Sequence, residues 1–254
     1  MLPAVLIEAF SSRPGASNGA AVVALDRPVA DIWMQSTAAS LRQSETAFLL
    51  QRQGNWLLRW FTPTCEVPLC GHATLASLLA LHHWGHLRVG ETIRLFSRSG
   101  ALEVGMDASV PGLGHLQLPR GRLESAPCPP ALNRLLRRHL RCDAMAFWSS
   151  PLGYRVALLP EEAPLTGMAS PAAELPEDLR QGLVLMQGLG AADAGAAAVP
   201  RVGGRPADYR LRFFAPGLGI EEDPVTGSAH ALVASYWMER LGRDQVVGWQ
   251  CSDR

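Results

Sequence analysis

Two distant segments of the sequence resemble each other, and this similarity constrains the fold more than any other feature. Residues 58–63 read LRWFTP and residues 211–216 read LRFFAP, so the second copy begins 153 positions after the first. The apolar segments that follow, CGHATLASLLALHHW and TGSAHALVASYW, pair Gly71 with Gly227 at an offset of 156 positions. Each copy predicts a strand, a loop containing proline, and a long helix that starts at a glycine. Chance similarity is the alternative; a duplication predicts two similar lobes with a ligand-binding cleft between them.

The composition is that of a globular protein without a strongly charged surface. The 254 residues are 48% hydrophobic and 18% charged, with 23 basic and 23 acidic side chains. This length suits one large domain or two lobes, and the balanced charge argues against nucleic acid as a partner. The apolar start, MLPAVLIEAF, lacks the basic flank and cleavage site of a signal peptide and is interpreted as a first strand. No apolar run reaches the length of a membrane span, so no membrane partner is predicted.

The cysteines are odd in number and form no CxxC pair, which favours free thiols in a reducing compartment. They are Cys65, Cys70, Cys128, Cys142 and Cys251. This spacing predicts neither a disulfide framework nor a zinc site. The segment GLGAADAG is similar to a loose dinucleotide-binding signature, but no acidic residue follows at the required distance after a second strand. The sequence therefore predicts no metal and no organic cofactor.

Short apolar runs bounded by turn residues predict many strands. They are residues 4–10, 20–25, 46–51, 55–61 and 92–97, with hairpin turns at residues 53–55 and at Gly100. Helices are predicted over residues 28–42, 72–85, 130–140 and 227–242. The first should turn Ile32, Met34 and Ala38 inward, and the second is apolar nearly all round and should be buried on all sides. Residues 120–130 are the predicted linker, and residues 188–206 a surface loop.

The starts of the two repeated helices are candidate binding sites for an anion. The first turn of a helix carries unpaired N–H groups and a partial positive charge, and a glycine there allows close approach of a ligand. Facing each other across the cleft, the two starts would bind a carboxylate or stabilise an enolate-like anion. The candidate substrate-binding residues are Gly71, Ala73, Thr74, Gly227, Ser228 and Ala229.

Two carboxylates are candidates for proton transfer. Glu45 enters an apolar strand in QSETAFLL, and burial there would raise its pKa and suit it to general acid/base chemistry. A solvated glutamate at a strand start is the alternative. In GIEEDPVTGSA, Asp223 lies in what reads as a solvated acidic loop before the helix. The functional alternative places Asp223 in a proton network with Glu45 and His72.

Three further side chains lie near the repeated helix starts. His72 is either a core histidine or a proton relay, and the helix dipole should lower its pKa and keep it neutral. Cys70 precedes the same helix, where the dipole should lower the pKa of its thiol. Its counterpart in the repeat is Thr226, so no cysteine pair is available. His230 lies one turn into the second helix, within reach of the predicted cleft.

Together these motifs resemble the PhzF-like family of phenazine biosynthesis isomerases. The segments QSETAFLL, CGHATLAS and EEDPVTGSAHALVASYW are similar to that family's motifs, and AFSSRPGASNGAAVVAL to its opening segment, with Gly19 where proline is usual. The resemblance implies the α+β fold of diaminopimelate epimerase. In that fold two similar lobes each wrap a curved antiparallel sheet around a central helix, with the active cleft between them. The lobes are expected at residues 1–122 and 123–254.

The resemblance also implies roles for individual residues. Glu45 would be the acid/base that moves a proton on the substrate, His72 and Asp223 would assist, and the backbone around Gly71 and Ser228 would bind the substrate. It further implies a cytoplasmic homodimer that needs no metal or organic cofactor. Family members usually continue past the QxS of residues 250–252 with further strands, so a truncated C-terminal lobe with an open sheet edge is expected.

Three functional hypotheses follow from these residues and the resemblance. The first is a cofactor-independent isomerase that moves a proton on a small unsaturated or carbonyl-activated carboxylic acid. The second is a racemase or epimerase of an amino or hydroxy acid that uses Cys70 as one base. The third is a protein that binds a metabolite without catalysis. The identity of the substrate depends on the shape of the pocket, which the sequence does not give.

Overall fold

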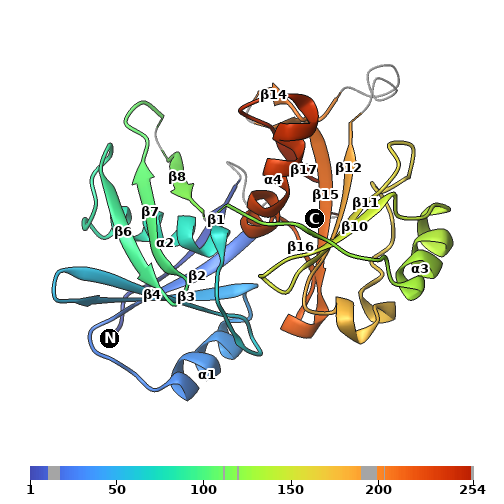
Figure 1. Ribbon diagram of the computed structural model, residues 1–254. Helices are drawn as coiled ribbons and strands as arrows, with labels where there is room; N and C mark the ends of the chain where they lie inside the picture. The colour runs from blue at the N-terminus through green and yellow to red at the C-terminus, as the bar shows by residue number, and fades with distance from the viewer. Residues whose placement is uncertain (11–17, 111, 119, 190–198, 203, 253–254) are drawn as a thin grey trace. The chain divides into compact units, whose positions relative to one another are not determined.

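The computed structural model describes residues 1–10, 18–110, 112–118, 120–189, 199–202 and 204–252, and it divides into two compact units (Figure 1). Unit 1 is Met1–Pro119 and unit 2 is Arg120–Arg254. The division falls at the start of the predicted linker, between residues 119 and 120, whereas the sequence placed it between residues 122 and 123. None of the helices in these described ranges is both long enough and apolar enough to cross a membrane.

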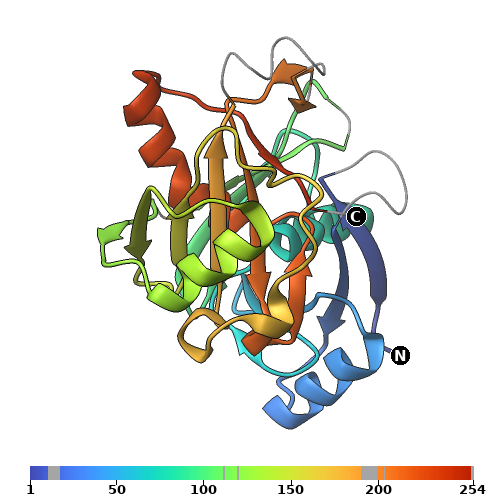
Figure 2. The ribbon, with the colours of Figure 1, turned by 90° about the vertical axis from the view of Figure 1, so that its right-hand side faces the viewer.

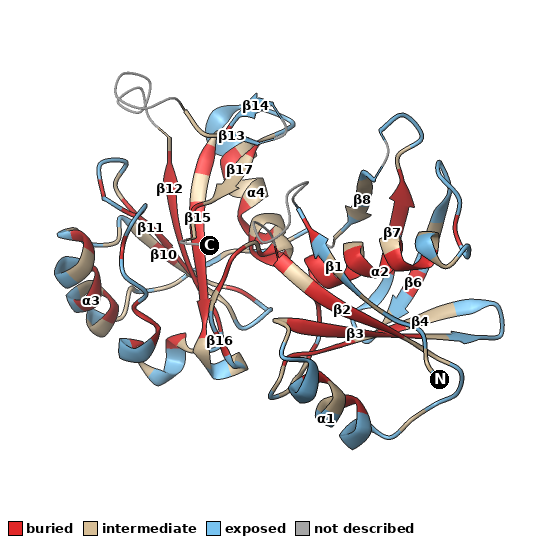
Figure 3. Cartoon of the chain, turned by 180° about the vertical axis from the view of Figure 1, so that it is seen from behind, coloured by how far each residue is buried: buried red, intermediate tan, exposed pale blue. Residues whose placement is uncertain are grey.

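Unit 1 is an eight-stranded sheet with one helix inside its curve. Its strands are β1 (Ala4–Ala9), β2 (Asn18–Leu25), β3 (Glu45–Arg52), β4 (Asn55–Phe61), β5 (Glu66–Val67), β6 (Thr92–Ser97), β7 (Gly100–Met106) and β8 (Gly114–Gln117). They run in the order β1-β2-β3-β4-β6-β7-β8, and β5 pairs with β4. Helix α2 (Gly71–His83) packs against β1, β2, β3, β7 and β8, so the sheet surrounds it. Figure 3 shows α2 mostly buried, as predicted from its apolar sequence.

Unit 2 has a sheet covered on both faces by helices. Its strands are β9 (Glu124–Ser125), β10 (Ala146–Ser149), β11 (Arg155–Leu158), β12 (Leu183–Gly188), β15 (Tyr209–Ala215), β16 (Ile220–Asp223) and β17 (Gly248–Gln250). The order is β16-β15-β12-β11-β10-β9, with β17 beside β15, and β13 (Arg201–Val202) pairs separately with β14 (Arg205–Pro206). Helix α3 (Pro130–Leu140) lies over one face of this sheet (Figure 2), and its buried leucines pack against that face. Side chains of α4 (Gly227–Leu241) pack on the other.

The two units have the same strand pairing, which confirms the duplication predicted from the sequence. In unit 1, β2 pairs with β3 in parallel, β3 with β4 antiparallel, and β4 with β6 in parallel. Unit 2 repeats this order: β11 pairs with β12 in parallel, β12 with β15 antiparallel, and β15 with β17 in parallel. In each unit the helix that begins at Gly71 or Gly227 follows the strand that carries the repeated LR[WF]F[TA]P segment.

An arginine–glutamate pair is also repeated between the units. Arg59 on β4 donates two hydrogen bonds of 2.7 Å each to Glu66, and Arg212 on β15 donates two of 2.7 and 2.6 Å to Glu222. Each guanidinium lies near the ring of the phenylalanine two residues on, at 5.1 and 5.2 Å from the centroid. Because both the pairing and the ring contact recur, chance similarity of the two segments does not explain the repeat. Glu222, expected to be solvated, is instead held by a buried cation.

Three sequence predictions need correction or completion. Helix α1 (Asp31–Leu41) buries Met34 and Ala38, but Ile32 is 74% exposed. Residues two apart do not share a helix face, so Ile32 cannot lie inward with Met34. The linker at residues 120–130 contains β9 and is therefore not wholly irregular. Most of the loop predicted at residues 188–206 lies outside the described residues, and its end forms the β13–β14 hairpin.

Candidate active site

A cluster of buried polar side chains lies at the start of α2 in unit 1. Glu45 is the first residue of β3 and Asn18 the first of β2, and these parallel strands bring the two side chains to the same end of the sheet. Cys70 caps α2 and His72 is its second residue. Glu45 is 6% exposed and His72 2% exposed, so the alternative of a solvated glutamate at a strand start is wrong. The fold has thus buried an ionisable pair in unit 1.

His72 is the centre of this cluster. Its Nε2 lies 3.1 Å from Glu45 Oε2 and 3.1 Å from Ser44 Oγ. On the opposite edge of the ring, Nδ1 lies 3.2 Å from Asn18 Nδ2 and 3.4 Å from Cys70 Sγ. Glu45 Oε2 is fully buried and, within the part of the chain that the structure describes, accepts no well-formed hydrogen bond. A lone pair of a buried carboxylate is thus left facing the imidazole.

The charges of Glu45 and His72 stabilise each other. Burial acts to raise the pKa of Glu45, but the adjacent His72 and hydrogen bonds outweigh it, and the net pKa is lowered. Burial acts to lower the pKa of His72, yet Cys70 and Glu45 together raise it well above its usual value. Both expectations from the sequence are therefore wrong. Glu45 is not tuned toward neutrality, and the helix dipole does not keep His72 uncharged, because an ion pair at 3.1 Å outweighs both effects.

Cys70 is not the activated thiol that its position suggested. Burial and the charge of Glu45 raise its pKa to about 11 despite the opposing effect of His72. The helix dipole acts over the first turn only, and its effect on the thiol is weaker than the effects of burial and of the Glu45 charge. Since the thiol stays protonated at neutral pH, Glu45 is the charge that holds the proton on His72 there.

Asn18 and Ser44 orient the imidazole, and the role of Asn18 was missed in the sequence. Ser44 Oγ donates to Asn18 Oδ1 at 2.9 Å, which turns the amide N–H of Asn18 toward His72 Nδ1. An N–H donor at Nδ1 fits the neutral ring whose proton is on Nε2, the nitrogen that faces Glu45, so Asn18 opposes the second protonation of the ring that the charge of Glu45 promotes. The Asn18 amide and the Glu45 carboxylate therefore act on opposite ring nitrogens. Asn18 lies within the family-like opening segment, but nothing in the sequence linked it with His72.

Replacing Asn18 by aspartate is expected to raise the pKa of His72 further, because a carboxylate replaces an amide at Nδ1. The imidazolium would then be held by an acceptor at each nitrogen. Titration of the ¹⁵N-labelled ring by NMR measures this pKa directly, and His230 in the same spectrum is an internal control. An unchanged His72 titration would show that Asn18 does not control its protonation.

Glu45, Cys70 and His72 are also the described residues whose donor atoms come close enough to share one ion, all within 4.8 Å of one another. The orientation of the ring does not favour this. Nε2 faces Glu45 and Nδ1 faces Cys70, so neither nitrogen directs its lone pair at a point near both other donors. The arrangement fits proton transfer better than metal coordination, and the absence of a metal stays a prediction.

A second polar cluster lies before α4 in unit 2. Asp223 ends β16 and is buried, and its Oδ2 accepts a 2.6 Å hydrogen bond from Thr226 Oγ1. Gln250 on β17 holds the same loop: its Oε1 accepts from the Thr226 N–H at 2.7 Å, and its amide donates to Thr226 Oγ1 at 3.1 Å and to the Asp223 carbonyl. Ser252 Oγ donates to the Pro224 carbonyl at 3.1 Å. The Gln and Ser of the QxS segment thus fix the start of α4, which sequence reasoning did not predict.

The two predicted helix starts have the same backbone arrangement. The first helical hydrogen bonds run from the Thr74 N–H to the Cys70 carbonyl at 3.3 Å and from the His230 N–H to the Thr226 carbonyl at 3.1 Å. The three N–H groups before each of these therefore have no acceptor within their own helix. They belong to Gly71, His72 and Ala73 in α2, and to Gly227, Ser228 and Ala229 in α4. Thr74 is buried and its hydroxyl is bonded to the Cys70 carbonyl, so it stabilises the turn.

Acid is expected to destabilise unit 2 through His230. This residue contacts Tyr209 Oη through Nδ1 at 2.9 Å, and burial lowers its pKa from 6.5 to about 4, opposed by Gln250. The unfolded chain therefore binds this proton more readily than the folded one. The contribution of His230 to stability is complete above about pH 6.5 and is lost as the pH falls toward 4, by roughly 2–3 kcal/mol.

Urea unfolding of the wild type and of His230→Gln at pH 7 and pH 5 measures this contribution. Glutamine retains a polar group near Tyr209 and does not titrate in this range. The variant should lose less stability on acidification than the wild type, and His72, whose pKa is shifted the other way, is common to both proteins. Equal losses in the two proteins would contradict the assignment to His230.

The family relationship agrees with this geometry. The family model for phenazine biosynthesis-like proteins (PhzC-PhzF) matches residues 7–120 and 180–253, which include both clusters. The chain belongs to the phenazine biosynthesis-like protein family. An uncharacterized isomerase of Pseudomonas aeruginosa is 36% identical to it, over 98% of this chain and 86% of the relative. A human phenazine biosynthesis-like domain-containing protein is 30% identical, over all of this chain and 89% of the relative.

Solved structures confirm the fold of this phenazine biosynthesis-like protein. The PhzF-family protein of Enterococcus faecalis superimposes with a TM-score of 0.78 at 29% identity, covering 99% of this chain and 87% of that one. A hydroxyproline epimerase from Agrobacterium vitis, solved with bound trans-4-hydroxy-L-proline, gives a TM-score of 0.56 over 91% of this chain and 76% of that one. At 11% identity this second likeness shows the fold alone. The predicted diaminopimelate epimerase-like fold is thus confirmed.

Proposed function

We propose that this protein is an isomerase that moves a proton between two carbons of a small unsaturated or carbonyl-activated carboxylic acid, with Glu45 as the acid/base. One observation carries the proposal. Glu45 Oε2 is buried, accepts no well-formed hydrogen bond from the described residues, and lies 3.1 Å from His72 Nε2. A buried carboxylate that is ionised at neutral pH, and that has a lone pair without a well-formed hydrogen bond, can accept a proton from carbon.

The proposed reaction is balanced without an electron donor or acceptor. Glu45 Oε2 takes a proton from a carbon next to the activating group, and the C–H electrons move into the conjugated system to give an enolate-like anion. The proton then returns from Glu45 to a different carbon of the same substrate, which restores the carboxylate. Because no electrons leave the substrate, the proposed reaction requires no redox cofactor.

His72 has two tasks in this scheme. As the imidazolium it keeps Glu45 ionised before the reaction, and it places a positive charge beside the anion that forms when Glu45 becomes neutral. The N–H groups of Gly71, His72 and Ala73 at the start of α2 would bind the substrate carboxylate. Equivalent groups of Gly227, Ser228 and Ala229 are proposed to bind it as well, and the assisting role of Asp223 stays a prediction.

The proposed function is tested by isotope exchange. The protein is incubated in D₂O with a panel of 2-amino, 2-hydroxy and β,γ-unsaturated carboxylic acids, and the carbon-bound protons are followed by ¹H NMR. Loss of one proton signal together with appearance of an isomer supports the proposal. Binding of acids without exchange would instead support the third hypothesis, a metabolite-binding protein.

One contact favours racemisation as a second candidate function. Cys70 Sγ lies 3.4 Å from His72 Nδ1, so a thiol and a carboxylate flank one imidazole. A racemase needs an acid and a base on opposite faces of the substrate carbon. The high pKa of Cys70 suits it to donate a proton and makes it a poor base at neutral pH. The family resemblance adds the proposal that the protein acts as a cytoplasmic homodimer.

A further inference from the structure

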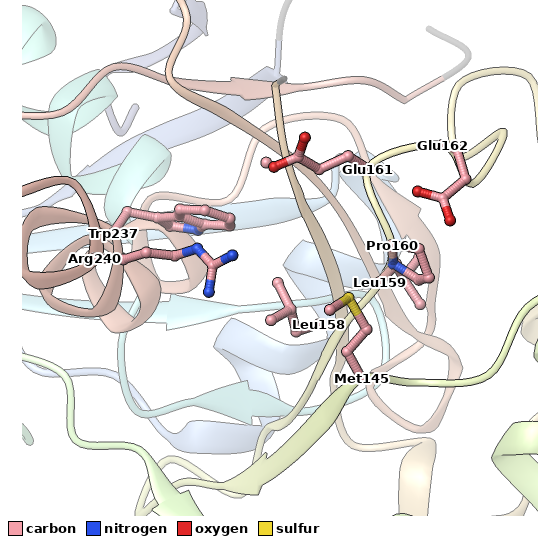
Figure 4. Close-up of a pocket in the computed structure, with 9 residues that line it drawn as sticks. Met145, Leu158, Leu159, Pro160, Glu161, Glu162, Trp237 and Arg240 are labelled. Atoms are coloured by element: carbon pink, nitrogen blue, oxygen red, sulfur yellow. The ribbon is translucent and has the colours of Figure 1, made fainter. Parts of the chain in front are cut away.

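Unit 2 contains a pocket of about 360 Å³ that includes none of the proposed catalytic or substrate-binding residues. It lies between the loop after β11 and the outer turns of α4 (Figure 4). Residues that line it include Met145, Leu158, Glu161, Glu162, Trp237 and Arg240. A pocket of this size accommodates a small metabolite. Its walls combine charges of both signs with an apolar floor.

The charges stand on opposite sides of the pocket. Figure 4 shows the Arg240 guanidinium and the Glu161 carboxylate directed toward the same space from two different elements. Arg240 Nη1 donates to Tyr236 Oη at 3.2 Å, and the guanidinium lies 5.9 Å from the centre of the Trp237 ring, so the cation is held in place. Arg240 and Glu161 are both exposed and both line the pocket. Both charges therefore remain available to a ligand.

The acidic wall is built on a fixed loop. Buried Gln187 on β12 donates its side-chain amide to the carbonyls of Glu161 and Ala163, each at 2.8 Å, and to that of Pro160. Arg210 Nε in turn donates to Gln187 Oε1 at 2.6 Å. Three carbonyls share the two hydrogens of one buried amide, which fixes the backbone that carries Glu161. The backbone at Glu161 therefore needs no reordering when a ligand binds.

The floor of the pocket is apolar and includes a polar group that lacks a partner. Trp237 is 2% exposed, and its Nε1 has no acceptor among the described residues. Gly188 leaves room beside this ring, since a Cβ there would lie 3.2 Å from Glu161 Oε1 and 3.3 Å from the indole edge.

We propose that this pocket binds a zwitterionic α-amino acid with an apolar side chain. The ammonium group binds Glu161, the carboxylate binds Arg240, and the side chain covers Leu158 and Met145. Opposite charges across a pocket match the two ends of one zwitterion, whereas a simple amine or a simple acid satisfies only one wall. The proposal does not depend on the reaction at Glu45, and binding rather than turnover tests it.

Isothermal titration of the full-length protein with L-leucine provides the test. Isopentylamine and 4-methylpentanoate, which each lack one charged group of leucine, should bind at least about tenfold more weakly, since each loses a charge-assisted hydrogen bond. Glu161→Gln and Arg240→Gln should each weaken leucine binding by about tenfold as well. Gly188→Ala should also weaken it by narrowing the space beside Trp237.

Two controls separate this pocket from other effects. Glu239→Gln changes an exposed carboxylate next to Arg240 that does not line the pocket, and it should leave leucine binding unchanged. Glu45→Gln should also leave it unchanged, because Glu45 belongs to unit 1. Leucine binding that is lost in Glu45→Gln but kept in Arg240→Gln would overturn the proposal. So would equal affinity for the two analogues, or no heat of binding up to millimolar concentrations.

Discussion

Replacing Glu45 by glutamine is expected to slow proton exchange by about 10²–10⁴-fold, the usual contribution of a general acid/base. Glutamine has nearly the same shape as glutamate but cannot accept a proton from carbon. The exchange of substrate protons in D₂O, followed by ¹H NMR, measures the effect. Loss of exchange should come with retained folding, because glutamine keeps the volume of the side chain at the start of β3.

The Glu45→Gln variant can also be tested without a substrate, through the pKa of His72. Glu45 holds the pKa of His72 up by its charge, so Glu45→Gln should lower that pKa, measured by NMR of the ¹⁵N-labelled ring. Cys70→Ser is the matched control at the other edge of the imidazole. If proton transfer runs through Glu45 alone, Cys70→Ser retains most exchange, whereas a racemase that uses both groups loses it. Undiminished exchange in Glu45→Gln would remove Glu45 from the mechanism.

The fold was predictable from the sequence because local and repeated signals agreed. The match between residues 58–63 and 211–216 anticipated strands β4 and β15, and the glycine that follows each marked the start of α2 and α4. The apolar composition of α2 predicted that it would be buried on all sides, and the family resemblance implied that a sheet would surround it. Ile32 was misplaced because it was judged by hydrophobicity rather than by its angular position relative to Met34. Strand β9 is too short to leave a pattern.

The site was predictable only as far as its residues lie in the two motifs. Glu45 and His72 were identified, but the distance between them, and hence the direction of both pKa shifts, depends on the pairing of β3 with β2 and on the packing of α2. Asn18 and Gln250 act through contacts with residues 54 and 24 positions away. Contacts of this kind arise from tertiary structure, and a single sequence does not encode them as a recognisable spacing.

The repeated arginine–glutamate pairs allow the effect of burial to be measured within one protein. Arg212 is fully buried, and besides Glu222 it binds the carbonyls of Leu165 and Met168. The equivalent Arg59 is 25% exposed and is shared between Glu66 and the exposed Asp31. The two arginines have the same strand position but differ in solvent access, and at the exposed site Arg98 also pairs with Glu66 and Asp31. Replacing each arginine by leucine should therefore have unequal consequences.

Arg212→Leu is expected to destabilise the protein by about 3–5 kcal/mol, because it leaves Glu222 and two carbonyls without their cation. Arg59→Leu should lower the free energy of unfolding by only about 1 kcal/mol, since water can hydrate the carboxylates that Arg59 binds. At about 2–4 °C per kcal/mol for a chain of this size, thermal unfolding separates the two variants clearly. The double variant Arg212→Leu with Glu222→Leu should recover part of the loss, because the second change removes the uncompensated carboxylate. Equal losses for Arg59 and Arg212 would mean that burial does not determine the strength of the repeated pair.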